Sequence, residues 1–294
     1  MEETGAKRIL LDIPGLLSHI LKYIAGVLPV FVPLVTPIQG IAAGISPATP
    51  EISIIIDDIG YRLRDDRRAM TLPGSLAYAI MPMSPHAKLM SHLATEHGKT
   101  VLLHLPMQPI AVEQNKFLGP GALKVGMTRE QFMRTLQTDL RSLPNAVGVN
   151  NHMGSLLTQY HGQMEWLMET LNNDNKFYID SMTISDSVAG KIARENQVPC
   201  LRRDVFLDNK LNTAYIQHQF EHLVELAKLR GHAVAIGHPH PETIRVLMKN
   251  LSELDKYGVT LVSLPDMIKD RSTRKLAHHI SMSGAITSTS LRME

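Results

Sequence analysis

The chain has 294 residues, 44% hydrophobic and 20% charged, which is typical of a folded globular protein rather than of a disordered or low-complexity chain. The formal net charge is only +2, so the composition does not predict a nucleic-acid partner. A single cysteine, Cys200, excludes an intramolecular disulfide and a cysteine-rich zinc module. Any metal site must therefore use histidine and carboxylate side chains, and 14 histidines are available.

The first 50 residues are typical of a targeting segment. The stretch between Lys22 and Glu51 has no Asp, Glu, Lys or Arg, and it ends in small residues that offer cleavage near Ala43 or Ala48. We expect an export signal over residues 1–50, which implies a periplasmic or cell-envelope location. A membrane anchor and a cytosolic tail stay open as alternatives, although prolines disfavour a membrane helix. The folded domain is expected over residues 51–270, followed by a mobile polar tail over 271–294.

Apolar runs of strand length alternate with amphipathic stretches of helical length through the middle of the chain. The predicted strands cover residues 52–56, 76–80, 101–103, 146–149, 177–179, 205–207, 233–236 and 260–262. The predicted helices cover residues 85–97, 128–142, 163–172, 187–197, 212–230 and 241–256. Thr128 and Gln131 have the spacing of a capping box. Because such alternation is typical of parallel sheets, the sequence predicts one α/β domain, a (β/α) barrel of seven or eight units, closed or nearly closed.

Polar side chains follow six of the predicted strands. In a parallel barrel these strand ends lie at one face, so residues far apart in the sequence are expected to converge there. Turns and helix caps are also polar, and that alternative stays open for Asp180, Ser181 and Asp208. The dominance of His and Asp, without Lys or Arg, favours a functional site. The strand-end residues are Asp57, Asp58, His104, Asn150, Asn151, His152, Asp180, Ser181, Asp208, His238 and His240.

The strings around these strand ends resemble the divergent polysaccharide deacetylase family. They are IIIDDIGYR (54–62), LLHLPM (102–107), GVNNHMGS (148–155), IDSMT (179–183), VFLD (205–208) and IGHPHPET (236–243), in the family's order. The similarity covers about residues 51–268. It implies a NodB-like, distorted (β/α) barrel of seven or eight units, a bacterial envelope or periplasmic location, and metal-dependent de-N-acetylation of a polysaccharide or glycan.

Amide hydrolysis needs a strong nucleophile, and a bound divalent metal supplies one by lowering the pKa of water while it polarises the carbonyl. Catalytic zinc typically has three protein ligands and one open position. Asp58, His104 and His152, each at the end of a different strand, are the predicted ligands. Zinc suits this set best, and nickel, cobalt, iron and manganese stay open.

The resemblance assigns Asp57 as general base and His238 as general acid. Adjacent carboxylates point differently, so Asp57 is free to act on the water if Asp58 faces the barrel axis. A backbone N–H near Pro106 or Met107 is expected to hold the oxyanion. The remaining candidates, as substrate-binding residues or residues that support the ligands, are Asn150, Asn151, Ser155, Asp180, Ser181, Asp208 and His240.

Two departures from the family's pattern bear on the activity. Polysaccharide deacetylases of established activity in the wider superfamily usually carry a second histidine four residues after the first metal-binding histidine. This chain has Gln108 there, so His152 is expected to replace that histidine. The arginine and proline motif of the wider superfamily also has no clear counterpart. The leading hypothesis is therefore a metal-dependent deacetylase, and the alternative is an envelope glycan-binding or assembly protein without turnover. Hydrolysis of an O-ester or a phosphoester also stays open.

Overall fold

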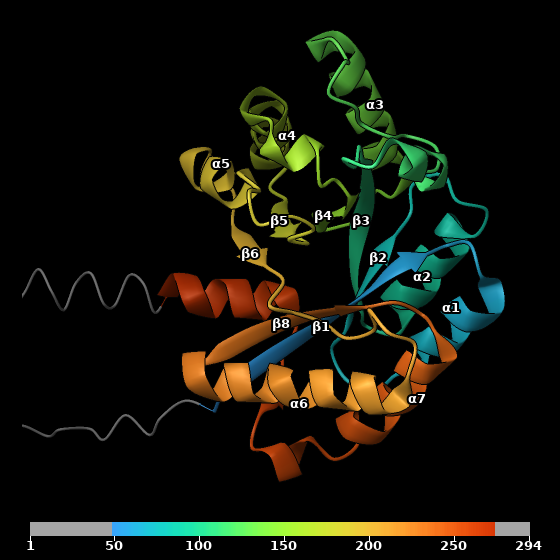
Figure 1. Ribbon diagram of the computed structural model, residues 1–294, viewed down its shortest axis with the longest axis vertical. Helices are drawn as coiled ribbons and strands as arrows, with labels where there is room; N and C mark the ends of the chain where they lie inside the picture. The colour runs from blue at the N-terminus through green and yellow to red at the C-terminus, as the bar shows by residue number, and fades with distance from the viewer. Residues whose placement is uncertain (1–48, 274–294) are drawn as a thin grey trace, which may run out of the picture. The chain divides into compact units, whose positions relative to one another are not determined.

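The structure is a computed structural model that describes residues 49–273 (Figure 1). These residues form a parallel sheet in the order β6-β5-β4-β3-β2-β1-β8-β7, and β9 pairs with the beginning of β1. The sheet curls into a half-barrel with helices around its outer face. The strands are β1 Glu51–Ile59, β2 Ala77–Ile80, β3 Thr100–Met107, β4 Gly148–Met153, β5 Phe177–Asp180, β6 Cys200–Arg202, β7 Val205–Phe206, β8 His232–Gly237 and β9 Thr260–Leu261.

Helices connect the strands. They are α1 Leu63–Met70, α2 Ala87–Glu96, α3 Arg129–Ser142, α4 His161–Asn173, α5 Ala189–Glu195, α6 Thr213–Arg230 and α7 Pro241–Leu251. Short 3-10 turns add η1 Val112–Phe117, η2 Leu157–Gln159 and η3 Leu254–Tyr257. A further helix covers residues 264–273 at the end of the described chain. The predicted capping box is present, because Gln131 N–H donates to Thr128 Oγ1 and Thr128 N–H donates to Gln131 Oε1.

Both faces of the sheet are apolar, as expected when helices cover one face and a barrel interior lies on the other. Along β1, Ile54 and Ile56 belong to the core beneath the outer helices, whereas Ile55 belongs to a second core inside the barrel. The inner core also contains Leu264 and Met267 from the last helix. This alternation determines which strand residues point into the barrel interior. It therefore also determines which of them can reach a site at the carboxyl ends of the strands.

The barrel is open. β6 and β7 are the two ends of the strand order, and no pairing joins them within residues 49–273. The helix over residues 264–273 lies beside this gap and places Leu264 and Met267 in the inner core. The predicted distorted barrel is confirmed. The sequence left open whether the barrel is closed or only nearly closed, and in the structure it is not closed. The same helix continues past residue 270, where the polar tail was expected to begin.

The eight predicted strands are all present, with bounds shifted by a few residues. Sequence analysis missed β6, which has three residues, and α1, whose sequence LRDDRRAM is mostly charged. The export signal and most of the predicted tail lie outside the described residues. Within residues 49–273, no helix combines the length and the hydropathy needed to cross a membrane.

Asp139 on α3 is a buried carboxyl whose two oxygens accept no hydrogen bond within the described part of the chain. Burial raises its pKa from 3.8 to about 8. Because the folded-state pKa is the higher one, this group's contribution to stability is fully present below pH 3.8 and is lost as the pH rises towards 8.

We therefore expect Asp139→Asn to gain stability relative to wild type as the pH rises. From about pH 4 to about pH 7, the difference in unfolding free energy between the two proteins should grow by about 4 kcal/mol in favour of the variant. Urea denaturation of both proteins across this range measures it. A difference that does not change with pH would contradict the buried, protonated carboxyl.

Candidate functional site

Three side chains meet at the carboxyl ends of β1, β3 and β4; β3 and β4 are adjacent, and β2 lies between β1 and β3. Asp58 Oδ1 lies 3.2 Å from His104 Nε2 and 3.0 Å from His152 Nδ1. The two ring nitrogens are 3.2 Å apart. Asp58, His104 and His152, here called the ligand cluster, are therefore brought together as the sequence predicts.

The ligand cluster fits a divalent metal. Donor atoms bound to one zinc ion at about 2.0–2.2 Å lie roughly 3–3.5 Å from one another in a tetrahedral arrangement, which matches the observed separations. Asp58 Oδ1 is buried and accepts no well-oriented hydrogen bond, although two imidazole nitrogens surround it. A buried carboxylate oxygen without a donor is costly unless a cation neutralises it. Two imidazoles and one carboxylate also suit zinc chemically.

An irregularity in β1 brings both acids of the pair to the cluster. The register of β1 with β2 shifts between Ile56 and Ile59, and Asp58 adopts a positive φ of 59°. In a regular strand adjacent side chains point to opposite faces, but a bulge re-aims one of them. His104 Nε2 consequently lies 3.6 Å from Asp57 Oδ2 as well as beside Asp58. The expectation that the two carboxylates diverge is corrected: both face His104.

Asn150 fixes the orientation of Asp57 and of the His104 ring. Its Nδ2 donates to Asp57 Oδ1 at 2.8 Å, and its Oδ1 lies 2.9 Å from His104 Nδ1. Because the amide oxygen can only accept, Nδ1 must carry the ring proton. In a neutral ring this leaves the lone pair on Nε2, which faces Asp58 and His152, and that is the tautomer a metal ligand needs.

His238 approaches the cluster from the end of β8. Its Nε2 lies 3.9 Å from Asp58 Oδ2, and its Nδ1 donates to Asp208 Oδ1 at 2.9 Å. Asp208 Oδ2 accepts from the backbone N–H of His238 and from Thr243 Oγ1. Burial alone would lower the pKa of His238, but the hydrogen bond and charge of Asp208 outweigh it and raise the pKa to about 9. The ring is thus held as a proton donor.

The two adjacent acids differ in their proton affinity. Burial raises the pKa of Asp57, although His104 and His238 oppose it. Burial also acts to raise the pKa of Asp58, but the two imidazoles beside it, of His104 and His152, hold that pKa well below its usual range. One carboxyl therefore suits proton transfer, and the other stays ionised.

Asp208→Asn is expected to lower the pKa of His238 from about 9 towards its ordinary value of 6.5, because the negative partner of Nδ1 is removed. An NMR titration of the histidine rings in metal-free protein measures this. Thr243→Val is the matched control, since it removes a hydrogen bond to Asp208 while keeping the charge. An unchanged His238 pKa in the asparagine variant would exclude Asp208 as its positioning residue.

Comparison with known proteins decides the family. The model of the family described as "Divergent polysaccharide deacetylase" matches residues 54–268. The chain belongs to the divergent polysaccharide deacetylase family. It is 39% identical to an uncharacterized protein of Haemophilus influenzae and 36% identical to the uncharacterized protein YibQ of Escherichia coli. Each alignment covers 75% of this chain, with 77% and 68% of the respective relative.

The solved structures agree on the fold. The crystal structure of an uncharacterized protein from Agrobacterium tumefaciens C58 superposes with a TM-score of 0.72 at 20% identity. The superposition covers 74% of this chain and 89% of that one. The fold shared with that protein therefore extends over nearly all of the described residues.

Gln108, which stands where active deacetylases usually have a second histidine, does not reach the ligand cluster. Its Oε1 accepts from Val125 N–H at 2.9 Å, and its backbone carbonyl accepts from the N–H groups of Leu156 and Leu157. Gln108 instead ties together the loops after β3 and β4. The third position of the cluster belongs to His152, as the sequence predicts.

Four of the remaining candidates support loops instead of facing the cluster. Asn151 Oδ1 accepts from Ser181 N–H and from Tyr178 Oη. Asp180 accepts from Met182 N–H and Ser187 Oγ, and it caps no helix, because α5 begins at Ala189 with Val188 at its N-cap and no side-chain cap. Ser155 Oγ accepts from Ile110 N–H and so holds the loop after β3. The residues placed in this group are Asn151, Ser155, Asp180 and Ser181.

His240 and the expected oxyanion donors have weaker support. The His240 ring lies 5.8 Å from the His238 ring, and Asp208, His238 and His240 form a second cluster of possible ligands. Asp208 already accepts three hydrogen bonds in that cluster, so it acts as a positioning residue for His238. Pro106 has no N–H, which leaves Met107, within the β3 ladder, as the remaining candidate oxyanion donor.

Three residues that sequence analysis missed lie around the cluster. The Tyr61 side chain and the Phe117 backbone approach it: burial and the charge of Asp58 raise the pKa of Tyr61, and the Phe117 carbonyl oxygen lies 3.4 Å from His152 Nε2. Arg203 stacks at 3.8 Å on the Phe206 ring, which in turn stacks on His238. The charge of Asp57 also acts on Arg203. The position of Arg203 in the string RRDVFLD (202–208), which ends in a predicted site residue, is the sequence feature that could have identified it.

Proposed function

We propose that this protein is an exported, metal-dependent deacetylase that removes N-acetyl groups from a polysaccharide of the bacterial envelope. The observation that carries the proposal is the ligand cluster of Asp58, His104 and His152, with Asp57 and His238 beside it. Membership of the deacetylase family supports the substrate class. The proposed location rests on the charge-free N-terminal stretch of the sequence.

The cluster would hold one divalent ion, with zinc favoured by the donor set. When bound, such an ion supplies Lewis acidity and lowers the pKa of water. Asp57, held through Asn150, takes a proton from the attacking water. His238, held by Asp208, gives a proton to the amine nitrogen as the C–N bond breaks. The products are acetate and a free amine, so atoms and charge balance.

The surroundings of the cluster fit a sugar chain better than a small compact substrate. Tyr61, which the charge of Asp58 reaches, is 44% exposed, and Phe117, whose backbone carbonyl lies 3.4 Å from His152 Nε2, is 62% exposed. An exposed aromatic ring offers an apolar face on which a pyranose can pack, while the phenol oxygen of a tyrosine stays wet. The loop carrying Phe117 follows β3 and is tied down through Gln108 and Ser155.

Acetate release tests the proposal. The full chain, loaded with zinc, is incubated with chitin oligomers and with peptidoglycan, and acetate and new amines are counted against protein treated with a chelator. Release that stops on chelation and returns with zinc supports the deacetylase. No release from either substrate, together with glycan binding, would replace it by the glycan-binding alternative, which Gln108 in place of a histidine favours.

A further inference from the structure

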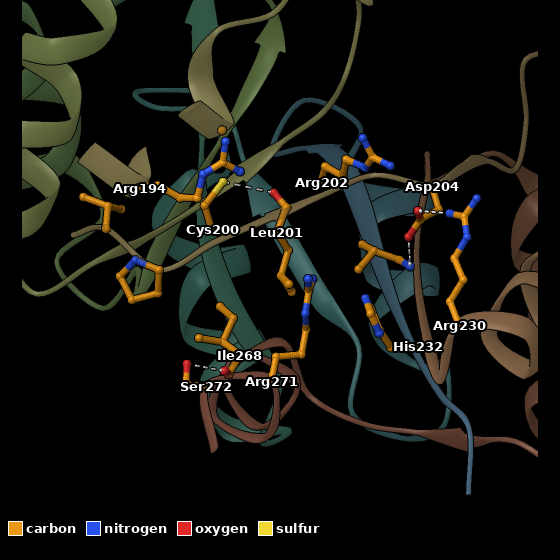
Figure 2. A pocket seen from close by; sticks show the side chains of 14 residues that line it. Arg194, Cys200, Leu201, Arg202, Asp204, Arg230, His232, Ile268, Arg271 and Ser272 are labelled. Atoms are coloured by element: carbon orange, nitrogen blue, oxygen red, sulfur yellow. Dashed lines mark hydrogen bonds and ion pairs between the residues drawn. The ribbon is translucent and has the colours of Figure 1, made fainter. Parts of the chain in front are cut away.

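A pocket lies at the beginning of β8, at the other end of that strand from His238 of the proposed active site. It has a volume of about 460 Å³ and occupies the gap in the open barrel between β6, β8 and the last helix (Figure 2). β8 begins at His232 in the pocket and ends at Gly237, just before His238 in the proposed active site. The two sites are therefore separated by the length of a strand.

The pocket concentrates positive charge. Four arginines line it, against the single acid Asp204: Arg194, Arg202, Arg230 and Arg271. Asp204 is already engaged, because Oδ1 pairs with Arg230 at 3.1 Å and Oδ2 accepts from Val234 N–H. The other three arginines form no ion pair within the described residues. Three arginines thus line the pocket without a directly paired carboxylate among the described residues.

Burial of the half-buried Arg271 lowers its pKa; the charge of Asp204 opposes this shift, and the charge of Arg202 adds to it. Cys200 lies among them, but burial and the charge of Asp180 raise the pKa of its thiol to about 12. The thiol is therefore protonated and is a packed free cysteine, as the sequence suggests, rather than an internal anion.

We propose that this pocket binds the phosphate group of a ligand about the size of a sugar phosphate. Arginine presents a planar fork that pairs with phosphate oxygens through two parallel hydrogen bonds. The volume lies within the range of roughly 300–1,000 Å³ that is usual for small-molecule sites. Pro199, Leu201 and Ile268 give the pocket an apolar wall for the rest of the ligand.

Either a soluble phosphate ester or a lipid headgroup can supply this phosphate. The chain enters the barrel at this end, because Glu51 N–H donates to Gly231 O beside the pocket residue His232. The expected export or anchor segment precedes this point in the sequence. A lipid surface is thus a source that the experiment must separate from a free ligand.

Calorimetric titration of the full chain with glucose 6-phosphate, and with glucose as the ligand lacking phosphate, tests the soluble source. We expect binding of the phosphate ester alone, weakened at least about tenfold in the double variant Arg202→Gln/Arg271→Gln. Arg141→Gln is the matched control, since Arg141 is exposed on α3 far from the pocket residues in the sequence and lines no part of it. If the double variant does not fold, the exposed Arg202→Gln alone replaces it.

Sedimentation with phosphatidylglycerol vesicles, against phosphatidylcholine vesicles, tests the lipid source. Binding to the anionic vesicles that is lost in the double variant and kept in Arg141→Gln assigns the pocket to a lipid headgroup. The proposal would be overturned if wild type and the double variant bound glucose 6-phosphate equally and also bound the anionic vesicles equally. It would also be overturned if glucose bound as tightly as glucose 6-phosphate. Neither result bears on acetate release, which is measured at the other end of the strands.

Discussion

Asp57→Asn is expected to lower kcat for acetate release by about 10²–10⁴-fold while the metal content stays at the wild-type level. Asp57 Oδ2 lies 3.6 Å from His104 Nε2, close to the cluster, but Asp57 is not one of the three residues whose donor atoms converge. Asparagine keeps the size of the side chain and an oxygen that can accept from Asn150 Nδ2. It cannot take a proton from water, so only the general base is removed.

Asp58→Asn is the matched control for this prediction, because it makes the same chemical change one residue further on. There we expect loss of the metal, measured by elemental analysis, since Asp58 Oδ1 is the shared neighbour of both imidazoles. If Asp57→Asn also lost the metal, Asp57 would be a ligand and another base would be required. If it kept full activity, the general-base role would be wrong.

The convergence of the site could be predicted from the sequence because it follows from topology. Asp58, His104 and His152 each follow an apolar strand, and parallel strands end at one face. The register of β3 with β4 then pairs His104 with Asn150 and Pro106 with His152, which places both imidazoles on the inner side of adjacent strands. For the two histidines nothing beyond strand assignment and period two was needed.

Details that depend on departures from regular geometry could not be predicted. The positive φ of Asp58 and the register shift beside it turn both acids towards His104. The residue types at these positions do not indicate either backbone feature. The role of Asp180 in holding its loop and the positioning role of Asp208 look alike in sequence, since both acids come at the end of a short apolar run. Their partners, Ser187 and His238, become visible only when the chain is folded.

The open side of the barrel was also hidden in the sequence. Alternating strands and helices predict a barrel whether or not its last strands pair. Here β6 has three residues and β7 has two, so both offer few backbone groups for pairing, and the last helix packs Leu264 and Met267 into the interior beside them. The arginine-lined pocket is a consequence of that opening, and its members are scattered over the last third of the chain.

His152→Ala is expected to weaken zinc binding by more than about 100-fold, and with it to abolish acetate release. Related active enzymes usually have a metal-binding histidine at the position of Gln108. In this chain we expect His152, a member of the ligand cluster, to take the place of that histidine. Its Nδ1 lies 3.0 Å from Asp58 Oδ1, and its ring is half-buried, so removal leaves one imidazole and one carboxylate. Elemental analysis and competition with a zinc chelator measure the loss.

The double variant His152→Ala/Gln108→His distinguishes a replaced ligand from a lost one. Gln108 Oε1 accepts from Val125 N–H, and its backbone is held by Leu123 and Leu156, so the side chain is directed away from the cluster. We therefore expect histidine at position 108 not to restore zinc binding. Restored binding would show that the loop after β3 can turn towards the cluster. Wild-type zinc affinity in the His152→Ala single variant would remove His152 from the site and favour glycan binding without turnover, since only two ligands would remain.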